Sequence, residues 1–466
     1  MIAVFIIVLL AFAAIGISSF RFKKTTSQDY LLASQSVPAW LVALSAVATN
    51  NSGYMFIGMI GYSYIEGLSS IWLMVGWILG DLFGSFMVYG RLRDYSEKFG
   101  LYSFGSLLAN DQGNNLPLVQ RIAGLLSLVF LSLYAAAQFN AGGKALFATL
   151  SIDPWIGVLI GCVLVVMYCF SGGIRASIWT DAAQSIVMII AMGLLFLYAV
   201  EDQGGMDNSI SKLSEVSTDY MSWMGAGGSI STAGLIIVGW FFAGLGVVGQ
   251  PHCMVRFMTL KKDSKVGTVR WYYYSWFTGF YALAIGVGLW SRIVLSDQGA
   301  FDPELALPMM TLHLMPDYMV GIVLAGIFAA TISTADSLII SCTAAVSNDL
   351  FPRLKEVYSA NKWLTIGIAI GAALVTLWGN TSVFHVVIYA WAVLGSTFGP
   401  VVILRMLNQR IDQVTTISMI LVSAIVVIGW NALGWGTTIV YEMLPGIISG
   451  FLVYTVLRLI GLNRNS

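Results

Sequence analysis

Apolar stretches of about 20 residues recur along almost the whole chain, and this pattern restricts its fold more than any other feature. They lie near residues 1–20, 39–65, 69–90, 118–149, 154–171, 178–200, 229–250, 271–292, 318–346, 363–379, 383–405, 414–432 and 437–460. A bilayer-crossing helix has roughly this length, so we predict an all-α polytopic membrane protein with about 13 transmembrane helices. Only 10% of the residues are charged, which excludes an ordinary soluble protein.

The formal net charge is +0, so charge gives no reason to expect a nucleic acid or an acidic protein as a partner. The four cysteines lie within or beside apolar segments without metal-ligand spacing, and we interpret them as reduced packing residues. We therefore expect the lipid bilayer to surround the chain and no obligatory protein partner.

Basic residues are distributed unevenly between the predicted loops. If the N-terminus lies outside, the inner loops contain every lysine and arginine except Lys144, Lys212 and Arg292, and they include Arg256. A miscounted helix would invert all later loops and destroy this bias. We therefore predict a plasma-membrane protein, which in a bacterium means the inner membrane, with its N-terminus outside and its C-terminus in the cytoplasm.

Two of the windows are poor continuous helices. The first, residues 41–61, has TNNSG at its centre, and the second, residues 239–251, reads GWFFAGLGVVGQP. Unwound backbone at membrane depth must be covered by protein or a cavity, and paired broken helices are typical of transporter sites. Glycines that merely allow close packing are the alternative, which stays open for the second break. Consecutive asparagines favour a functional role for the first.

The breaks lie where two five-helix repeats would place their first helices. We predict one transmembrane domain, 1–466, that contains a first repeat (39–200) and a second repeat (229–405). The flanking parts are residues 1–38, with a helix and an inner loop, and residues 406–466, with two helices. An outer loop, residues 201–228, connects the repeats.

The stretch ATISTADSLIIS, residues 330–341, places polar groups inside an apolar window. On a helix, Ser333, Thr334, Asp336 and Ser337 share one broad face. Hydroxyls and freed carbonyls form an oxygen-only site that suits a hard cation such as sodium. Hydroxyls that bond back to the preceding turn are the alternative. The intramembrane carboxylate favours a functional role, with a cation as its partner.

Of the other charged residues within the windows, Asp181, Asp81 and Lys144 require an interpretation. Asp181, in WTDAAQS, lies near an inner helix end and is less diagnostic. For Asp81, a helix–helix hydrogen bond and a role in the transport pathway both stay open. Lys144 lies near an outer helix end, where snorkelling to the interface is expected.

In these residues the chain resembles the sodium:solute symporter family, over nearly its whole length. The shared motifs are DYLLASQSVPAW, LSAVATNNSGYMFIG, WTD after GGIRAS, GQPHCMVRFM, AATISTADS and YAWAVLGSTFGPVV. GQPH with VRFM, YAWA with FGPVV, and LPGIISG are most similar to the sodium/proline branch. The resemblance implies a LeuT-like inverted repeat of ten helices with additional flanking helices.

The resemblance also implies a sodium site between the first and eighth core helices. Its ligands would be the carbonyls of Ala48, Asn51 and Ala330 and the hydroxyls of Ser333 and Thr334. Some family members bind a second sodium, which here would use Asp181, Ser333, Asp336 and Ser337. Asp336 stands where some relatives have serine, so either a second sodium or a proton is expected there.

The resemblance implies a substrate site with altered walls. The sodium/proline branch has an aspartate at the position of Asn50, and a tryptophan and a tyrosine at those of Ala243 and Val247. The expected substrate residues are Asn50, Ser52, Gly53, Tyr134, Gln138, Phe242, Tyr389 and Trp391. With no cationic residue evident there, a zwitterion is favoured, its carboxylate facing half-helix amide groups near residues 51–53.

We therefore predict a sodium-coupled secondary active symporter that imports a small organic solute, an amino acid such as proline or a related zwitterion. Sodium is the only cofactor expected. The alternatives are sodium-coupled uptake of a monocarboxylate, pantothenate, sialic acid or a sugar, or a membrane sensory module of the same fold. An enzyme is not expected, because His252, His313 and His385 lie at separate segment ends or loops without a nucleophile.

Overall fold

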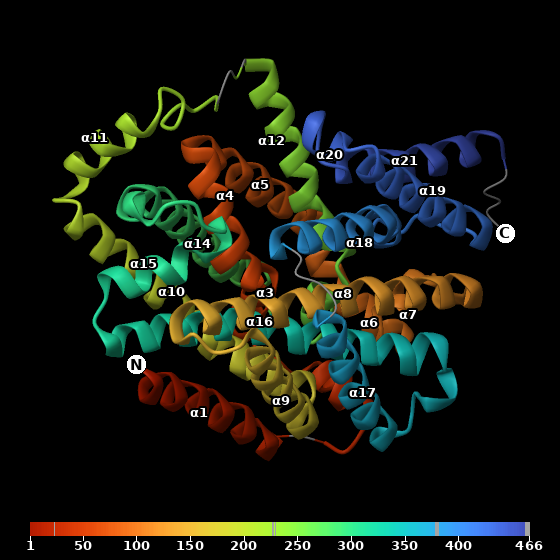
Figure 1. Ribbon diagram of the computed structural model, residues 1–466. Coiled ribbons are helices and arrows are strands. Elements are labelled where there is room, and N and C mark those ends of the chain that lie inside the picture. Colours follow the sequence, from red (N-terminus) through yellow and green to blue (C-terminus); the bar gives the residue numbers. More distant parts are fainter. Residues whose placement is uncertain (23, 226–227, 229, 378–381, 462–466) are drawn as a thin grey trace.

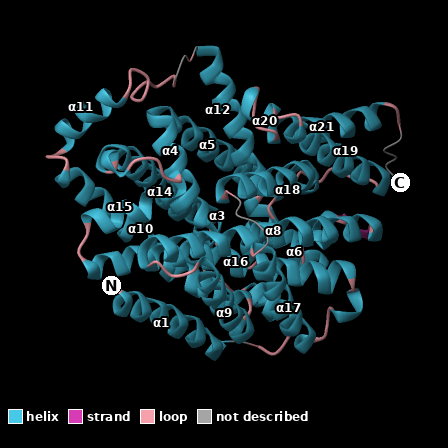
Figure 2. Ribbon diagram, in the orientation of Figure 1, coloured by secondary structure: helices cyan, strands magenta, loops and turns pink. Residues whose placement is uncertain are grey.

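The computed structural model describes residues 1–22, 24–225, 228, 230–377 and 382–461. The described chain is almost entirely helical, as Figure 2 shows, with one short antiparallel pair formed by β1 (Asn110–Asp111) and β2 (Asn114–Asn115). Lys23 and Arg464, both expected on the inner side, and residues 226–227 of the expected outer loop lie outside the described residues.

Each predicted apolar window contains a helix. The α-helices are α1 (Ile2–Ser18), α2 (Ser27–Leu32), α3 (Ala39–Gly53), α4 (Met59–Glu66), α5 (Ile71–Met87), α6 (Tyr89–Phe99), α7 (Phe104–Leu108), α8 (Pro117–Leu150), α9 (Pro154–Gly172), α10 (Ile174–Asp202), α11 (Met206–Val216), α12 (Ile230–Leu245), α13 (Pro251–Met258), α14 (Val266–Val294), α15 (Ala306–Leu314), α16 (Asp317–Ala344), α17 (Tyr358–Thr376), α18 (Val383–Met406), α19 (Gln413–Ala432), α20 (Trp435–Thr438) and α21 (Met443–Leu459).

Several of these helices are suited to a bilayer. By length and composition, 7 described helices could cross a membrane, or up to 8 if the bent pair of α12 and α13 is one span. Three shorter apolar helices accompany them in the described chain, namely α1, most of α9, and α21. The multi-pass architecture is confirmed, whereas the total of about 13 crossings stays a prediction.

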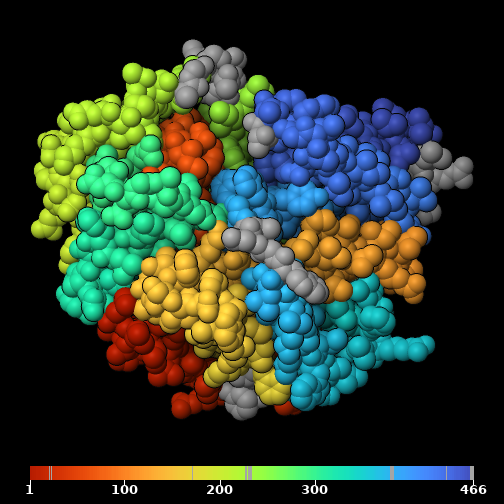
Figure 3. Space-filling view, in the orientation of Figure 1, coloured from red at the N-terminus to blue at the C-terminus, as the bar shows by residue number. Residues whose placement is uncertain are grey.

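The broken helix α3 lies in the interior, in contact with α10, α14 and α16. The long helices α8 and α16 pack side by side through the middle of the molecule, and α19, α20 and α21 form a group beside α18 (Figure 1). The start of α1 and the end of α21 lie at opposite ends of the bundle. Figure 3 shows early, middle and late segments packed against one another on one face.

Small residues allow α5 and α12 to approach closely. A methyl group at Gly80 would overlap the carbonyl oxygen of Phe241, and one at Gly244 would overlap that of Trp77. Small residues at helix contacts are the usual means of close packing in membranes. Helix α12, which precedes the second break, therefore packs closely against α5, the helix that follows the first broken helix.

Both predicted breaks are confirmed. In α3, Ser52 has φ 39° and ψ −178°, and a π-helical turn, η3 (Tyr54–Gly58), follows before α4. A positive φ is uncommon for a residue other than glycine. After α12, a 3₁₀ turn, η5 (Gly246–Gly249), and Gln250 with φ −92° and ψ 108° lead into α13. The axes on the two sides of this second break differ by 54°.

Candidate functional site

Helix α8 holds the first break on one side. The Gln138 side-chain oxygen accepts a hydrogen bond from the Gly53 amide at 2.8 Å, and the Tyr134 hydroxyl donates to Ser52 Oγ at 3.3 Å. A methyl group at Gly53 would lie 2.6 Å from Thr331 Cγ2 on α16, so no larger residue fits. Four of the expected substrate residues, Ser52, Gly53, Tyr134 and Gln138, therefore lie together at the break.

Helix α16 holds the same break on the other side. The Thr334 hydroxyl donates to the carbonyl oxygen of Thr49 at 3.0 Å, and the Thr49 and Ser337 hydroxyls lie 3.2 Å apart. The Ser333 hydroxyl donates to the Ala330 carbonyl at 3.1 Å. A helix that ends leaves its last carbonyls without intrahelical partners, and here an α16 hydroxyl reaches one of them.

The expected sodium ligands therefore come from two facing segments. Ala48, Ala330, Ser333 and Thr334 have no exposed surface, and Asn51 has 1%. Asn51 also donates through Nδ2 to the Val47 carbonyl at 2.7 Å. These donor groups are neutral oxygens, which fit a weakly bound hard cation. Ion binding by these five residues stays a prediction.

A buried arginine stands at the expected second cation site. Arg256 Nη2 lies 3.2 Å from Asp181 Oδ2 and 4.0 Å from Asp336 Oδ1, and it hydrogen-bonds to Ser177 Oγ at 2.9 Å and to Ser337 Oγ. Ser177 Oγ also donates to Asp336 Oδ1 at 2.9 Å. We call Arg256, Asp181 and Asp336 with these two serines the arginine cluster.

The interpretation of Arg256 as an inner-loop residue is therefore wrong. Its side chain has no exposed surface, and its Nε and Nη1 atoms donate to Ser45 Oγ at 3.2 Å and to the His252 carbonyl at 2.8 Å. Burying a guanidinium requires paired charge, and two carboxylates supply it. The intramembrane aspartates were the available signal, because such groups need a partner and Arg256 follows the second break by one to two turns.

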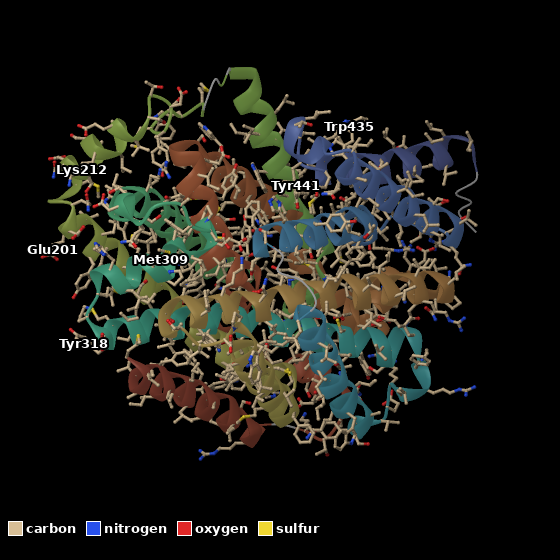
Figure 4. All side chains as sticks on the ribbon, viewed as in Figure 1. Glu201, Lys212, Met309, Tyr318, Trp435 and Tyr441 are labelled. Atoms are coloured by element: carbon tan, nitrogen blue, oxygen red, sulfur yellow. The ribbon has the colours of Figure 1, made fainter. Side chains whose placement is uncertain are left out.

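Trp391 on α18 contacts residues on both sides of the second break. Its indole NH donates to the Ala243 carbonyl at 2.9 Å, and its own carbonyl accepts from Gln250 Nε2 at 2.8 Å. Its ring centroid lies 5.2 Å from Trp77 and 6.1 Å from His252. Figure 4 shows Tyr441 near α12 and α18, where it stacks on Trp240 and donates to the Ile388 carbonyl at 2.6 Å.

Two expected substrate residues lie elsewhere. Phe242 packs against Phe241 with centroids 5.8 Å apart, and Tyr389 packs against Phe130 at 6.2 Å. Both are half-buried. The described contacts do not join either ring to the first break, so their substrate role stays a prediction.

Asn50 faces away from α8. Its Nδ2 atom donates to the Tyr273 hydroxyl at 2.6 Å and to Asp81 Oδ2 at 3.3 Å, which connects the break to α14 and α5. The helix–helix hydrogen bond considered for Asp81 is present.

Several of the buried polar atoms without partners among the described residues lie near the breaks. Within the described part of the chain, neither ring nitrogen of His252 has a hydrogen-bond partner, nor have Gln138 Nε2 and the Oδ1 atoms of Asn50 and Asn51. Such atoms are rare in native proteins and indicate where water or a ligand binds. His252 is not among the site residues expected from the sequence, and its ring lies 5.4 Å from that of Tyr134.

Comparisons with known proteins show the family of this chain. The profile of the Sodium:solute symporter family matches residues 30–422. The high-affinity proline transporter PutP of Bacillus subtilis is 30% identical over 94% of this chain and 93% of its own. The sodium/proline symporter of Escherichia coli is 27% identical over 99% of this chain and 93% of its own.

Solved structures show the same fold. A Na⁺-coupled sialic acid symporter in a substrate-bound outward-open state superposes with a TM-score of 0.82 at 18% identity, over 98% of this chain and 97% of that one. MhsT in complex with L-phenylalanine gives 0.53 at 16% identity, over 89% of this chain and 97% of that one. These structural relatives have the LeuT fold, and the superpositions show that this chain shares it. With two broken helices facing hydroxyl-bearing partners, and a family profile that matches most of its length, the chain belongs to the sodium:solute symporter family.

Proposed function

We propose that this symporter imports an amino acid, proline or a related zwitterion, together with sodium by alternating access. The single observation that carries the proposal is the first break, where α8 and α16 hold opposite sides of one unwound segment by hydrogen bonds. The two curated relatives reported above transport proline, which supports the solute class.

The proposed sodium ligands are the carbonyls of Ala48, Asn51 and Ala330 and the hydroxyls of Ser333 and Thr334. A cation there would connect α3 to α16. Transport is coupled only if ion and solute stabilise the same conformation, because a ligand with equal affinity for two states shifts neither. A cation that strengthens the contact between α3 and α16 would stabilise the first break. The solute would bind at the same break, on the side that faces α8.

A second cation, sodium or a proton, is proposed at the arginine cluster. Arg256 provides one positive charge for the two carboxylates of Asp181 and Asp336. Asp181 Oδ1 and Asp336 Oδ2 are buried and have no hydrogen-bond partner among the described groups. One further monovalent cation would complete the charge balance of this cluster.

The solute site is proposed to include Asn50, Ser52, Gly53, Tyr134, Gln138, Phe242, Tyr389 and Trp391. The Arg256 guanidinium is held by carboxylates and hydroxyls, so it does not offer a strong site for an anionic solute. Amide groups at an unwound helix segment suit the carboxylate of a zwitterion.

The proposed topology is a five-plus-five inverted repeat, 39–200 and 229–405, with about 13 crossings in all. The N-terminus would lie outside and the C-terminus in the cytoplasm, with the protein in the bacterial inner membrane. An odd number of crossings agrees with the start of α1 and the end of α21 lying at opposite ends of the bundle (Figure 1).

Uptake by reconstituted protein tests the proposal. We expect proteoliposomes to accumulate L-proline, or an amino acid that competes with it, when an inward sodium gradient is imposed. Replacing both α16 hydroxyls, Ser333→Ala with Thr334→Ala, should abolish the stimulation by sodium because two ligands are lost. A control variant, Ser214→Ala on the exposed face of α11, should leave uptake unchanged. Uptake that is equal in sodium and choline would contradict the proposal.

A further inference from the structure

Asp81 on α5 is a fully buried carboxylate whose four hydrogen bonds come from three other helices. Its Oδ1 accepts from the Tyr89 hydroxyl at 2.5 Å and from the Tyr274 hydroxyl at 2.8 Å. Its Oδ2 accepts from the Tyr273 hydroxyl at 2.8 Å and from Asn50 Nδ2 at 3.3 Å. Each oxygen thus receives two donors, which leaves little room for a direct cation ligand.

The ion pairs of the described residues do not include Asp81. An intramembrane carboxylate is costly without a partner and is a functional hypothesis by default. Three phenols and one amide replace a counter-ion here, since hydrogen bonds to a charged acceptor are stronger than neutral ones. The net negative charge is therefore retained beside the first break.

The Asp81 carboxylate determines the orientation of the Asn50 side-chain amide. Tyr273 accepts from Asn50 Nδ2 at 2.6 Å and donates to Asp81, so these groups form a directed chain. If the amide were reversed, Asn50 Oδ1 would face Asp81 Oδ2, and two acceptors would repel each other. Asn50 Oδ1 must therefore point away from Asp81, and within the described residues it is buried without a partner.

We propose that Asp81 is a positioning residue for transport: it fixes the Asn50 amide so that Oδ1 presents a hydrogen-bond acceptor at the first break to a cationic group. This inference rests on the proposed function, since that group is either the ammonium of a zwitterionic solute or the transported sodium. Both are attracted by the same chemistry, an oriented carbonyl oxygen with a carboxylate behind it.

The test compares Asp81→Asn with the charge exchange Asn50→Asp combined with Asp81→Asn. Asparagine at 81 has nearly the same shape but no charge, and it can place an NH₂ group toward Asn50. We expect the KM for L-proline, or the sodium concentration for half-maximal uptake, to rise about tenfold with a smaller change in maximal rate. The exchange variant, which returns a carboxylate to the pair, should recover most of that loss.

The two measurements identify the cationic group. A rise in the KM for L-proline at saturating sodium assigns it to the solute, and a rise in the sodium requirement at saturating L-proline assigns it to the ion. Asp81→Asn with both constants unchanged would overturn the proposal, as would a loss confined to maximal rate. If wild-type protein shows no sodium-stimulated uptake, the proposed function fails instead.

Two further variants separate an effect on transport from a loss of stability. Asp349→Asn alters another buried carboxylate that two side chains contact, Ser103 Oγ at 2.6 Å and Gln120 Nε2 at 3.0 Å, and it should leave both constants unchanged. If Asp81→Asn does not fold, Tyr273→Phe removes the hydroxyl that accepts from Asn50 and donates to Asp81, which leaves only the longer direct contact between them at 3.3 Å. Its constants should rise in the same way, and unchanged constants in a folded Tyr273→Phe variant would overturn the proposal.

Discussion

Arg256 connects three elements through a single side chain. Its guanidinium contacts Ser45 on α3, Asp181 on α10 and Ser337 on α16, while its backbone belongs to α13. The planar group has five donors in a fixed arrangement, which lysine cannot reproduce. The relative position of both broken helices therefore depends on the buried guanidinium of Arg256.

Arg256→Gln should lower the thermal stability of the purified protein strongly. The change leaves two carboxylates buried without their cation, and such losses cost about 3–5 kcal/mol. Adding Asp336→Asn removes one of these charges and should recover part of the melting temperature. Arg91→Gln, at an exposed arginine, is the matched control and should change it little. A melting temperature of Arg256→Gln equal to that of wild type would show that the cluster does not support the fold.

At the residue scale, the sequence predicts groups that share a helix better than groups that meet across helices. Ser333, Thr334 and Ser337 follow helical spacing, so their common face could be anticipated. Besides its neighbour Ser337, Asp336 has partners on α10 and α13, Ser177 and Arg256, which lie more than 70 residues away in the chain. No local pattern relates them, so the sequence alone does not pair Arg256 with these residues.

At the element scale, a cluster on the predicted outer side links three elements. Glu304, in the 3₁₀ turn η7 (Pro303–Leu305), accepts from Lys144 Nζ of α8 at 2.5 Å and from the Ser382 hydroxyl at 2.7 Å. It also accepts from the amides of Val383 and Phe384, at 3.2 and 3.0 Å, where a helix N-terminus favours negative charge. Lys144 therefore pairs with acids, Asp302 included, in addition to lying near the outer end of its helix.

Lys144→Met should loosen this cluster and favour opening of the outer side. Tyr62 on α4 stacks on Phe384 with centroids 5.3 Å apart, so Tyr62→Cys places a thiol beside the start of α18 and reports whether this region becomes accessible. In a background in which the four native cysteines are replaced, we expect a membrane-impermeant maleimide to react about tenfold faster with this thiol when Lys144→Met is added. A tenfold change corresponds to a loss of about 1.4 kcal/mol in the free energy that favours the closed outer side. Lys212→Met, in the exposed helix α11, is the control. Equal rates in the two variants would contradict a role for Lys144 in closing this side.

The helices and both breaks could be predicted from the sequence because each depends on local composition: apolar runs, consecutive asparagines, and glycines before a proline. The cluster around Glu304 could not, because η7 and the start of α18 are brought together only by the packed bundle. The same holds for the contact of α5 with α12, which needs glycine on both helices.

For the whole molecule, ligand binding should appear as stability. Detergent-purified protein should melt at a higher temperature in sodium than in potassium, and higher again with L-proline, since any ligand of the native state stabilises it by mass action. At a ligand concentration 100 times Kd the gain is about 2.7 kcal/mol. Ser333→Ala with Thr334→Ala should remove the difference between sodium and potassium. The same melting temperature in both salts for wild type would argue against a sodium site.

The arginine cluster has an electrical consequence for the working cycle. With both carboxylates ionised, Asp181, Asp336 and Arg256 together bear one net negative charge. If the cation proposed for this cluster leaves to the inside, the carrier resets as an anion, and a membrane potential negative on the inside would drive that anion back toward the outer face. Each charge that crosses the full field gains about 2.3 kcal/mol per 100 mV. Voltage would then act chiefly on the return of the empty carrier, so a polarised cell would shorten the interval between imports.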